Sequence, residues 1–463
     1  MLKESETKMK KGHTYVQWML AIAVESIVFA YGLLVGWVSP MKSVLQSETS
    51  PFGRPVTDME MGWVASVVPL AAISGIPMFV YIADNYGRKL GIFVMAMFQT
   101  GCWILKLSTA NVPCLILARV LAGIASGCTY QLIPVYVKET SQDSIRGMLV
   151  SMNTLMQNFG LLLMYAMGPY LDYYAILWIG LGVSCVTLVA LIRAPETPPF
   201  MVKKGEYKKA QKTLAFLRGL DIDDKVVQNE IDCMKEDDRR ARELPDVTLI
   251  SIVKSKYSRT GLGILMLILG TQATNGTYVI FTYASFIISS SGVKMSPELQ
   301  TLSIPIVLIV GSLVSISCIE KFRRKFILAT GFGLTSVGLA SLASMLTVQY
   351  HGGSLPEWMP IAAIILTCWC YSAAIVPLTY TIMAEMFNFQ IRAKVSGCVC
   401  SWSWFMAFLQ LLFFIPLSDL VGFHNTIFCF AVINLFGFII TLVLVPETKG
   451  KSLEEIEKTL ATK

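Results

Sequence analysis

The sequence predicts an all-α membrane protein in which twelve spanning helices form two halves of six. Three observations carry this prediction: the apolar composition, the length of the apolar runs and the repetition of short motifs between the halves. Of the 463 residues, 54% are hydrophobic and only 15% are charged, and the mean hydropathy is +0.60. A soluble domain carries about 25% charged residues, so this chain has too many apolar side chains for a water-soluble globule.

The apolar residues lie in runs that are long enough to cross a bilayer. A bilayer core about 30 Å thick needs roughly 20 apolar residues in a helix. Twelve runs of this kind have centres near residues 26, 72, 99, 124, 158, 183, 275, 308, 336, 372, 406 and 435. The charged start of the chain precedes a first run that is too long for the core of a signal peptide, so we expect an uncleaved first helix.

The positive charges predict which side of the membrane each loop faces. With the N-terminus in the cytoplasm, Arg119 lies inside a span and 33 of the 38 Lys and Arg lie in or beside cytoplasmic segments. Cytoplasmic loops of membrane proteins carry such an excess. The pattern therefore predicts cytoplasmic N- and C-termini, and it explains the net charge of +7 without a nucleic-acid partner. The four residues expected on outer loops are Lys42, Arg54, Lys106 and Lys294.

A charged segment separates the first six spans from the last six. Residues 194–258 carry 13 Lys or Arg and 12 Asp or Glu, and they contain no spanning run. Apolar residues recur there at helical spacing, which predicts short amphipathic helices against the cytoplasmic face. The expected division is an N-terminal half at 1–193, the insert at 194–258, a C-terminal half at 259–445 and a cytoplasmic C-terminal helix at 446–463.

Short motifs repeat between the two halves. The tripeptide Pro-Glu-Thr follows the sixth span at 195–197 and the twelfth at 446–448. The loop after the second span reads DNYGRK (84–89), and the loop after the eighth reads EKFRRK (320–325). The fourth and tenth spans both end in a Glu that precedes an Arg by seven residues. Repetition of a six-helix unit is typical of transporters built from two parallel halves.

The repeated motifs place charges of both signs at the cytoplasmic ends of the helices. Such charges can pair across the seam between the halves, and the pairs would then hold an inner gate closed and break when it opens. A positive-inside bias alone would explain the basic residues but does not require the acids beside them. The expected gate residues are Asp84, Arg88, Glu139, Arg146, Glu196, Glu320, Arg324, Glu385, Arg392 and Glu447.

The sequence offers no candidate metal, cofactor or catalytic site. Most of the eleven cysteines lie in predicted spans, including those of CWC at 368–370 and CVC at 398–400. Positions i and i+2 of a helix do not face each other, so these cysteines fit the role of small packing residues better. A phosphate-binding loop of Walker form is also missing from the sequence. We therefore expect no metal, no cofactor and no enzymatic activity.

Several motifs in order resemble those of the sugar porters of the major facilitator superfamily. They are DNYGRK (84–89), the segment 118–147 with its Pro-x-Tyr-x-x-Glu turn, PETPPF (195–200) and PETKGKSLEEI (446–456). The stretch FAYGLLVGWVSP in the first span is most similar to the insect trehalose-transporter branch. The resemblance covers almost the whole chain. It implies the major facilitator fold, alternating access and a sugar substrate.

The resemblance also implies positions for substrate binding. Gln157 matches the fifth-span Gln of the family, and Gln272 matches the first Gln of its seventh-span stretch. Leu308 stands at the position of an eighth-span Asn, and Tyr380 replaces a tenth-span Trp. The expected substrate-binding residues are Gln157, Gln272, Tyr278, Ser372, Tyr380, Ser403 and Trp404.

These residue types suit a sugar, because sugar hydroxyls both donate and accept hydrogen bonds and the ring has an apolar face. Three expected amides or their equivalents are missing, and each unmade hydrogen bond costs about 0.5–1.5 kcal/mol. Because of these losses, we expect either a weak site for hexoses or a site shaped for another polyol or a disaccharide. Core packing is the alternative role for Tyr278 and Trp404, and hydrogen bonding between helices is the alternative for Gln157 and Gln272.

One acid and one base lie inside predicted spans, Glu25 in the first and Arg119 in the fourth. The resemblance implies that proton-coupled relatives pair a first-span acid with this Arg, but that acid position falls near Tyr31 here. A buried ionisable group is costly unless it is paired, so we hypothesise that Glu25 pairs with Arg119 or lines the cavity. A fixed structural pair, a proton-coupling role and a lipid- or solvent-facing position all stay open.

The expected function is facilitative transport of a neutral sugar, such as trehalose or glucose, across the plasma membrane by alternating access. Three alternatives stay open: proton-coupled sugar symport, transport of another polar solute, and a sensor that binds sugar without moving it.

Overall fold

The computed structural model describes residues 13–243, 254–290, 297–318, 321–353, 356, 358–387, 389–451 and 453–462. Every regular element in these residues is a helix. The N-terminal half contains α1 (Tyr15–Gly36), α2 (Val38–Leu45), α3 (Asp58–Asn85), α4 (Arg88–Ser108), α5 (Val112–Ser126), α6 (Thr129–Thr140), α7 (Asp143–Met167) and α8 (Tyr173–Ile192).

The C-terminal half repeats this arrangement of helices. Its elements are α13 (Lys256–Ala273), α14 (Thr277–Ser290), α15 (Pro297–Cys318), α16 (Arg324–Tyr350), α17 (Trp358–Cys370), the π-helix η1 (Tyr371–Ile375), α18 (Val376–Glu385), α19 (Phe389–Val421) and α20 (Phe423–Val443). Outside the two halves lie α9 (Pro198–Lys203), α10 (Tyr207–Arg218), α11 (Lys225–Glu243) and α21 (Leu453–Thr462).

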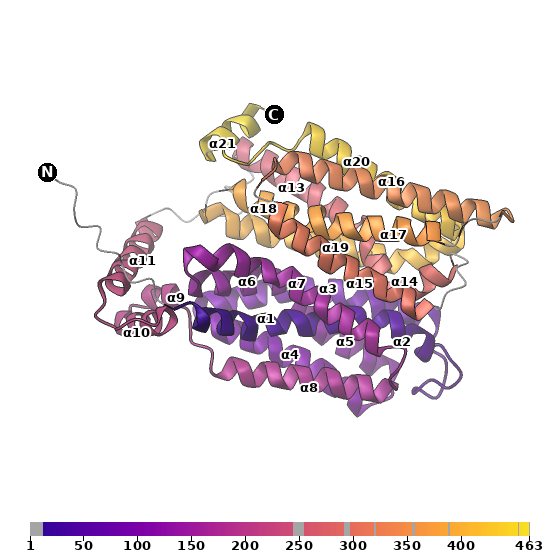
Figure 1. Cartoon of the computed structure of the whole chain (residues 1–463), viewed down its shortest axis with the longest axis horizontal. Coiled ribbons are helices and arrows are strands. Elements are labelled where there is room, and N and C mark those ends of the chain that lie inside the picture. The colour runs from indigo at the N-terminus through magenta and orange to yellow at the C-terminus, as the bar shows by residue number, and fades with distance from the viewer. Residues whose placement is uncertain are drawn as a thin grey trace.

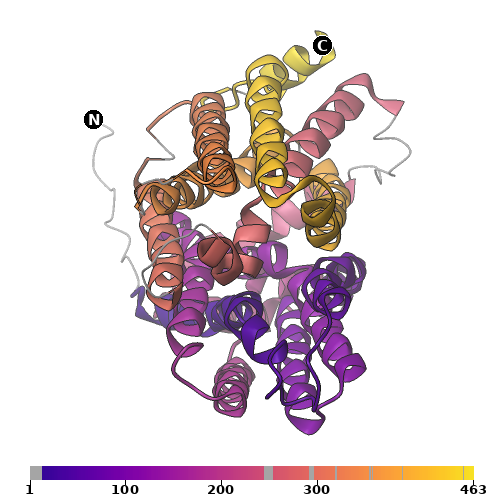
Figure 2. The same ribbon diagram turned by 90° about the vertical axis from the view of Figure 1, so that its right-hand side faces the viewer.

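The long helices run roughly parallel to one another and form two groups that face each other. Figure 1 shows α9, α10 and α11 at one end of the bundle, with α21 at the same end. We call this the insert end, and α2 lies at the opposite end. Viewed along the bundle, the indigo and purple N-terminal helices form one group and the orange and yellow C-terminal helices the other (Figure 2). The groups meet where α3 packs on α19 and α7 on α15.

Ten segments of the described chain are long and apolar enough to cross a membrane, which makes this a multi-pass membrane protein. Eleven of the twelve predicted centres lie in a helix of the bundle, and the twelfth, residue 275, lies in the break between α13 and α14. Two of the predicted spans, α7 and α15, are not among these ten segments. In α15, the segment Thr301–Ser317 forms a shorter apolar helix. α7 carries Thr154, Gln157 and Asn158 in its middle, so the polarity that weakens this span is concentrated where the cavity described below lies.

Three passes are broken near their middles, and these breaks carry cavity residues. α5 and α6 are separated by Gly127 and Cys128. Between α13 and α14, the Asn275 side chain accepts a hydrogen bond from the backbone nitrogen of Thr277 at 2.9 Å, which satisfies a free donor at the start of α14. The third break is η1, and Pro377 follows it without a backbone N–H. Single-turn π segments are frequent at functional sites.

Close packing of α3 on α5 holds part of the N-terminal half together. A Cβ atom added at Gly75 would lie 2.1 Å from the backbone oxygen of Ile124. No side chain fits there, so the backbones of the two helices can touch only because this residue is glycine.

The insert folds as a small helical unit that docks onto the N-terminal half. Most of its apolar residues at helical spacing are buried, such as Leu214 in α10 and Ile231 in α11, but Tyr207 at the start of α10 is 47% exposed. The Arg218 side chain bonds to Glu230 at 2.9 Å and to the backbone oxygen of Thr140 at 3.1 Å. Gln17 of α1 donates to the backbone oxygen of Leu217 at 3.0 Å. These bonds fix the insert to one half alone.

Candidate functional site

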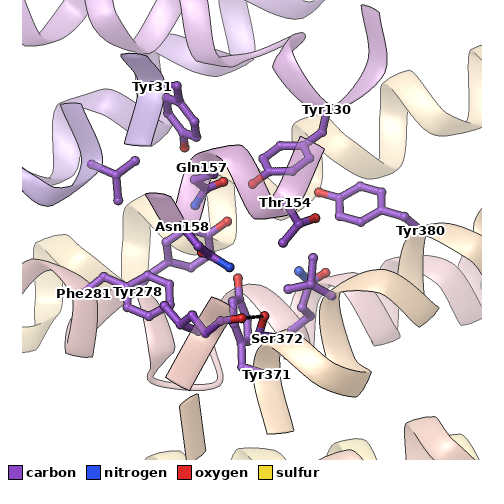
Figure 3. Close-up of a pocket in the computed structure, with 14 residues that line it drawn as sticks. Tyr31, Tyr130, Thr154, Gln157, Asn158, Tyr278, Phe281, Tyr371, Ser372 and Tyr380 are labelled. Atoms are coloured by element: carbon purple, nitrogen blue, oxygen red, sulfur yellow. Dashed lines mark hydrogen bonds between the residues drawn. The ribbon is translucent and has the colours of Figure 1, made fainter. Parts of the chain in front are cut away.

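A central cavity lies between the two halves, with about 510 Å³ of space that no atom fills, open solvent included. Figure 3 shows side chains from both halves pointing into it. Its lining residues are Tyr31, Val35, Tyr130, Thr154, Gln157, Asn158, Gln272, Tyr278, Phe281, Leu308, Tyr371, Ser372, Val376 and Tyr380.

Three amides line the cavity. Asn158 Nδ2 donates to Ser312 Oγ of the other half at 2.9 Å. Gln272 Oε1 accepts from Thr379 Oγ1 at 3.2 Å. Gln157 Oε1 is buried and has no hydrogen-bond partner among the described residues. Because a buried polar atom without a partner is costly, Gln157 is suited to accept a hydrogen bond from a solute.

Ser372 lies where η1 approaches α15. Its Oγ donates to the backbone oxygen of Leu308 at 2.7 Å and is 2.8 Å from Ser312 Oγ; the bond to Leu308 is drawn in Figure 3. Ser312 in turn receives the bond from Asn158. The chain Asn158–Ser312–Ser372 therefore joins the two halves beside the cavity, while Leu308 presents an apolar side chain to it.

Five tyrosines line the cavity, and they make its walls both aromatic and hydroxyl-rich. Tyr130 of α6 and Tyr380 of α18 stack across the seam with ring centroids 6.0 Å apart. Tyr31 meets Tyr130 edge to face at 6.5 Å. An aromatic ring offers a platform for the apolar face of a sugar, and a phenol adds a donor and an acceptor. Figure 3 shows the Tyr130 and Tyr380 rings side by side.

The sequence identified only part of this lining. Gln157, Gln272, Tyr278, Ser372 and Tyr380 line the cavity, as the resemblance implies. The lining residues that sequence reasoning missed are Tyr31, Tyr130, Thr154, Asn158 and Tyr371. Thr154 lies three residues before Gln157, so helical spacing placed it on the same face. The three tyrosines carry no such signal, because an aromatic residue in an apolar span usually packs in the core.

A second compartment of about 440 Å³ adjoins the central cavity and shares Tyr31, Val35 and Tyr278 with it. Trp404 lines this compartment rather than the central cavity, and its ring lies 6.4 Å from that of Tyr278. Ser403 lines neither space. Its hydroxyl donates to the backbone oxygen of Leu269 at 3.4 Å, which is a contact between α19 and α13.

Glu25 and Arg119 do not pair with each other, which corrects the hypothesis of a structural ion pair. Arg119 Nε donates to the backbone oxygen of Val64 at 3.0 Å, and its Nη1 donates to that of Leu34 at 2.8 Å. Both oxygens of Glu25 are buried and have no hydrogen-bond partner in the described part of the chain. Backbone carbonyls of α3 and α1 thus accept the hydrogen bonds of Arg119 that were expected to go to a carboxylate.

Lys106 was expected on an outer loop, but it is buried in a helix. It lies in the last turn of α4 and is 2% exposed. Its Nζ is 3.7 Å from the ring centroid of Trp37 and 4.4 Å from that of Trp103. Cation–π attraction to two indoles explains how this ammonium is held inside the half.

The Pro-Glu-Thr motif of the first half caps a helix at the insert end. Glu196 Oε1 accepts hydrogen bonds from the backbone nitrogens of Arg88 at 3.0 Å and Lys89 at 3.2 Å. These nitrogens belong to the free first turn of α4. Gly87, with φ +118°, makes room for the carboxylate, because a Cβ atom there would lie 2.1 Å from Glu196 Oε2. Burial raises the pKa of Glu196, and the backbone hydrogen bonds oppose that effect.

The second copy of the motif does the same in the other half. Glu447 accepts from the backbone nitrogens of Arg324 at 3.0 Å and Lys325 at 3.4 Å, at the start of α16. Arg323 stands at the position of Gly87, and its φ of −68° is open to any residue. This explains how the second loop tolerates an arginine where the family pattern has a glycine.

The ion pairs at the insert end lie within the halves, in contrast to the expected pairing across the seam. Arg88 pairs with Glu139 at 3.3 Å and with Asp84 at 3.6 Å in the N-terminal half. Arg324 pairs with Glu385 at 3.3 Å in the C-terminal half. Among the residues that the structure describes, no ion pair joins the two halves.

The remaining expected gate residues have local partners. Arg146 pairs with Asp143 and donates to the backbone oxygen of Lys138 at 3.2 Å. Arg392 donates to the backbone oxygen of Phe387 at 3.0 Å, and burial lowers the pKa of its guanidinium. Glu320 lies outside the described residues.

Side-chain contacts join the halves at the cavity and toward the opposite end. The Tyr165 hydroxyl of α7 donates to the backbone oxygen of Phe281 in α14 at 2.6 Å. Lys42 Nζ of α2 lies 5.1 Å from the centroid of the Tyr283 ring in α14. The seam is therefore bridged at the opposite end, whereas the charged groups at the insert end are paired inside each half.

Comparison with known proteins identifies the family. The family model described as "Sugar (and other) transporter" matches residues 18–460. The chain belongs to this sugar transporter family. Its members among the curated proteins include the facilitated trehalose transporter of Bombyx mori, which is 28% identical over 97% of this chain and 87% of the relative. A trehalose transporter homologue of Drosophila simulans is 27% identical over 97% of this chain and 92% of that protein.

Solved structures of sugar transporters have the same fold. The proton:xylose symporter XylE bound to 6-bromo-6-deoxy-D-glucose superposes with a TM-score of 0.73 at 19% identity, over 96% of this chain and 99% of that chain. The inward-open xylose transporter XylE from E. coli gives a TM-score of 0.75 at 19% identity with the same coverage. The predicted major facilitator fold is confirmed.

Proposed function

We propose that this sugar transporter family member carries a small sugar such as glucose or trehalose across the plasma membrane, passively and by alternating access. The observation that carries the proposal is the central cavity, in which the amides of Gln157, Asn158 and Gln272 come from both halves and face aromatic walls. Groups that donate and accept, next to apolar ring faces, suit the hydroxyls and the ring of a sugar. The names of the insect relatives favour trehalose among the candidates.

The distribution of contacts along the seam supports alternating access. Cross-seam contacts at the opposite end, such as Tyr165 with Phe281, hold the halves together there. At the insert end, the Arg88 and Arg324 clusters stiffen each half separately. Rocking of two stiff halves about the cavity is the motion that such a division favours. The charge pattern of the loops supports a cytoplasmic position for the insert end and both termini.

The ten expected gate residues keep their proposed role in this cycle, and nine of them lie in the described part of the chain. The ion pairs that these nine form in the state described here lie within the halves. In the state that is open to the outside, the insert ends approach each other, and the acids Glu139 and Glu385 come to face basic residues of the other half. Tyr130 lies in the same helix as Glu139, and Tyr380 lies in the same helix as Glu385. The stack of these two tyrosines forms a thin barrier between the cavity and the insert end.

Proton-coupled symport is the second candidate, and one observation favours it. Glu25 is fully buried in α1, and neither of its oxygens has a partner in the described part of the chain. A buried carboxyl group without a fixed partner is free to exchange a proton during the cycle.

Counterflow into proteoliposomes tests the function. Vesicles with the purified full-length protein are preloaded with unlabelled sugar, and entry of labelled glucose or trehalose is followed with and without a proton gradient. Facilitative transport predicts counterflow without any gradient. Flux that needs a proton gradient would support symport instead, and saturable binding without flux would support a sensor.

A further inference from the structure

The second compartment contains a buried positive charge with no counter-charge. Arg119 lines this compartment and is 4% exposed. A guanidinium has five N–H donors, and only two of those in Arg119 have acceptors, the backbone oxygens of Val64 and Leu34. Both acceptors are neutral. No ion pair in the described part of the chain includes Arg119, so its charge is compensated only by carbonyl dipoles.

Lys106 adds a second buried basic side chain to the same half. The indoles of Trp37 and Trp103 around it carry no formal charge, and its Nζ has no hydrogen-bond acceptor in the residues that the structure describes. This side of the half therefore supplies no carboxylate to Arg119. A buried guanidinium without a carboxylate creates a strong positive potential, because the low-dielectric interior screens charge poorly.

The other walls of the compartment define what kind of group fits there. Trp404 and Tyr278 provide aromatic faces, and Val68 and Leu411 provide aliphatic ones. Tyr31 lies on the boundary with the central cavity, and it interacts electrostatically with Arg119. A solute bound in the central cavity can thus extend one substituent past Tyr31 toward the guanidinium.

We infer that the second compartment is an anion subsite, in which Arg119 binds the carboxylate, sulfate or phosphate group of an acidic sugar whose ring lies in the central cavity. The planar guanidinium can hold a carboxylate by two parallel hydrogen bonds. The Tyr31 hydroxyl is available as a further donor. This inference rests on the proposed sugar transport and extends the substrate class from neutral sugars to sugars with one acidic group.

Competition by a matched pair of sugars tests the subsite. Glucuronate and its neutral methyl ester are compared as inhibitors of labelled glucose counterflow by the purified protein, at constant ionic strength. The anion subsite predicts that glucuronate inhibits at a concentration at least about tenfold lower than the ester, a factor equal to the gain of one charge-assisted hydrogen bond. Equal inhibition by acid and ester would overturn the inference.

Variants of Val68 test whether Arg119 is the source of the preference and leave its bonds to α1 and α3 in place. Val68 lies one helical turn after Val64, whose oxygen accepts from Arg119. Val68→Asp supplies a carboxylate to the guanidinium, and Val68→Asn has the same size without the charge. The preference for glucuronate over the ester should disappear in Val68→Asp and persist in Val68→Asn. A preference that survives in Val68→Asp would overturn the assignment to Arg119.

Thermal stabilisation keeps the inference testable if the protein does not transport glucose. In that case, the proposed sugar transport fails, and the purified protein is heated in the presence of glucuronate or its methyl ester. A larger rise of the unfolding temperature with glucuronate, lost in Val68→Asp, would still support an anion subsite. Equal rises, or none with either compound, would reject it independently of transport.

Discussion

Glu196 accepts a hydrogen bond from the backbone nitrogen of Arg88 at 3.0 Å, although the two residues lie 108 positions apart. Glu447 makes the same contact with Arg324 at 3.0 Å in the other half. A carboxylate at these positions satisfies free N–H groups and is favoured by the helix dipole. The repeated Pro-Glu-Thr motif is therefore a helix cap that each half supplies from the end of its sixth span to the start of its third.

Removal of the Glu196 cap should destabilise the N-terminal half. We expect Glu196→Ala to lower the free energy of unfolding by about 1 kcal/mol, because the first turn of α4 loses its acceptor. Glu48→Ala, at an exposed position, should have no such effect. The measurement is thermal unfolding of both purified variants, and equal unfolding temperatures would contradict the capping role.

The raised pKa of Glu196 gives this cap a pH dependence. Burial favours the neutral carboxyl in the folded state, so its pKa there lies above the ordinary value of 4.5. The wild type should therefore be most stable relative to Glu196→Gln below about pH 4.5 and should lose that advantage as the pH rises through the folded-state pKa. A difference in unfolding temperature that grows with pH would contradict the stated direction.

Gly87 should tolerate no side chain. We expect Gly87→Ala to destabilise the protein by roughly 1–3 kcal/mol, because φ is +118° and the new Cβ would meet the Glu196 carboxylate. Gly205→Ala is the matched control, since φ is +78° there but nothing lies within 4 Å of the added atom. A smaller loss of unfolding temperature for Gly87→Ala than for Gly205→Ala would show that the contact with Glu196 is unimportant.

The stacked rings of Tyr130 and Tyr380 should act as a pair. In a double-mutant cycle with Leu at each position, we expect a coupling of about 0.5–1.5 kcal/mol in the free energy of unfolding. The control cycle replaces Tyr130 and Tyr174, which are not in ring contact, and should be additive. Additivity in the Tyr130–Tyr380 cycle would mean that the rings do not form a barrier across the seam.

Sugar uptake by a Glu25 variant distinguishes passive from proton-coupled transport. Facilitative transport predicts that Glu25→Gln retains the pH dependence of sugar uptake seen in the wild type. The control is Glu48→Gln, which changes an exposed carboxylate outside the bundle. Loss of the pH dependence in Glu25→Gln alone would support proton coupling through this residue.

The sequence predicted the features that depend on local pattern. Hydrophobic runs and loop charges indicated the spans, and helical spacing identified the buried faces of α10 and α11, of which Leu214 is one residue. Five of seven expected substrate residues line the central cavity, because the motif positions fix the register of their helices.

Features that depend on packing between distant helices could not be predicted in this way. The partners of Arg119 are backbone oxygens of α1 and α3, and no residue type marks a carbonyl as an acceptor. The burial of Lys106 depends on two tryptophans from α1–α2 and α4 that converge only in the fold. The sequence also does not show whether the charged residues pair within or between the halves, since the same charges allow both arrangements.

The most direct test of the central cavity is glucose counterflow by Gln272→Ala, with Gln410→Leu as its control. Both residues are buried amides of the C-terminal half, but only Gln272 lines the cavity. We expect Gln272→Ala to raise the half-saturating glucose concentration about fivefold or more, the effect of losing about 1 kcal/mol of hydrogen bonding, and Gln410→Leu to leave it unchanged. Wild-type counterflow in Gln272→Ala would contradict the claim that sugar binds in this cavity.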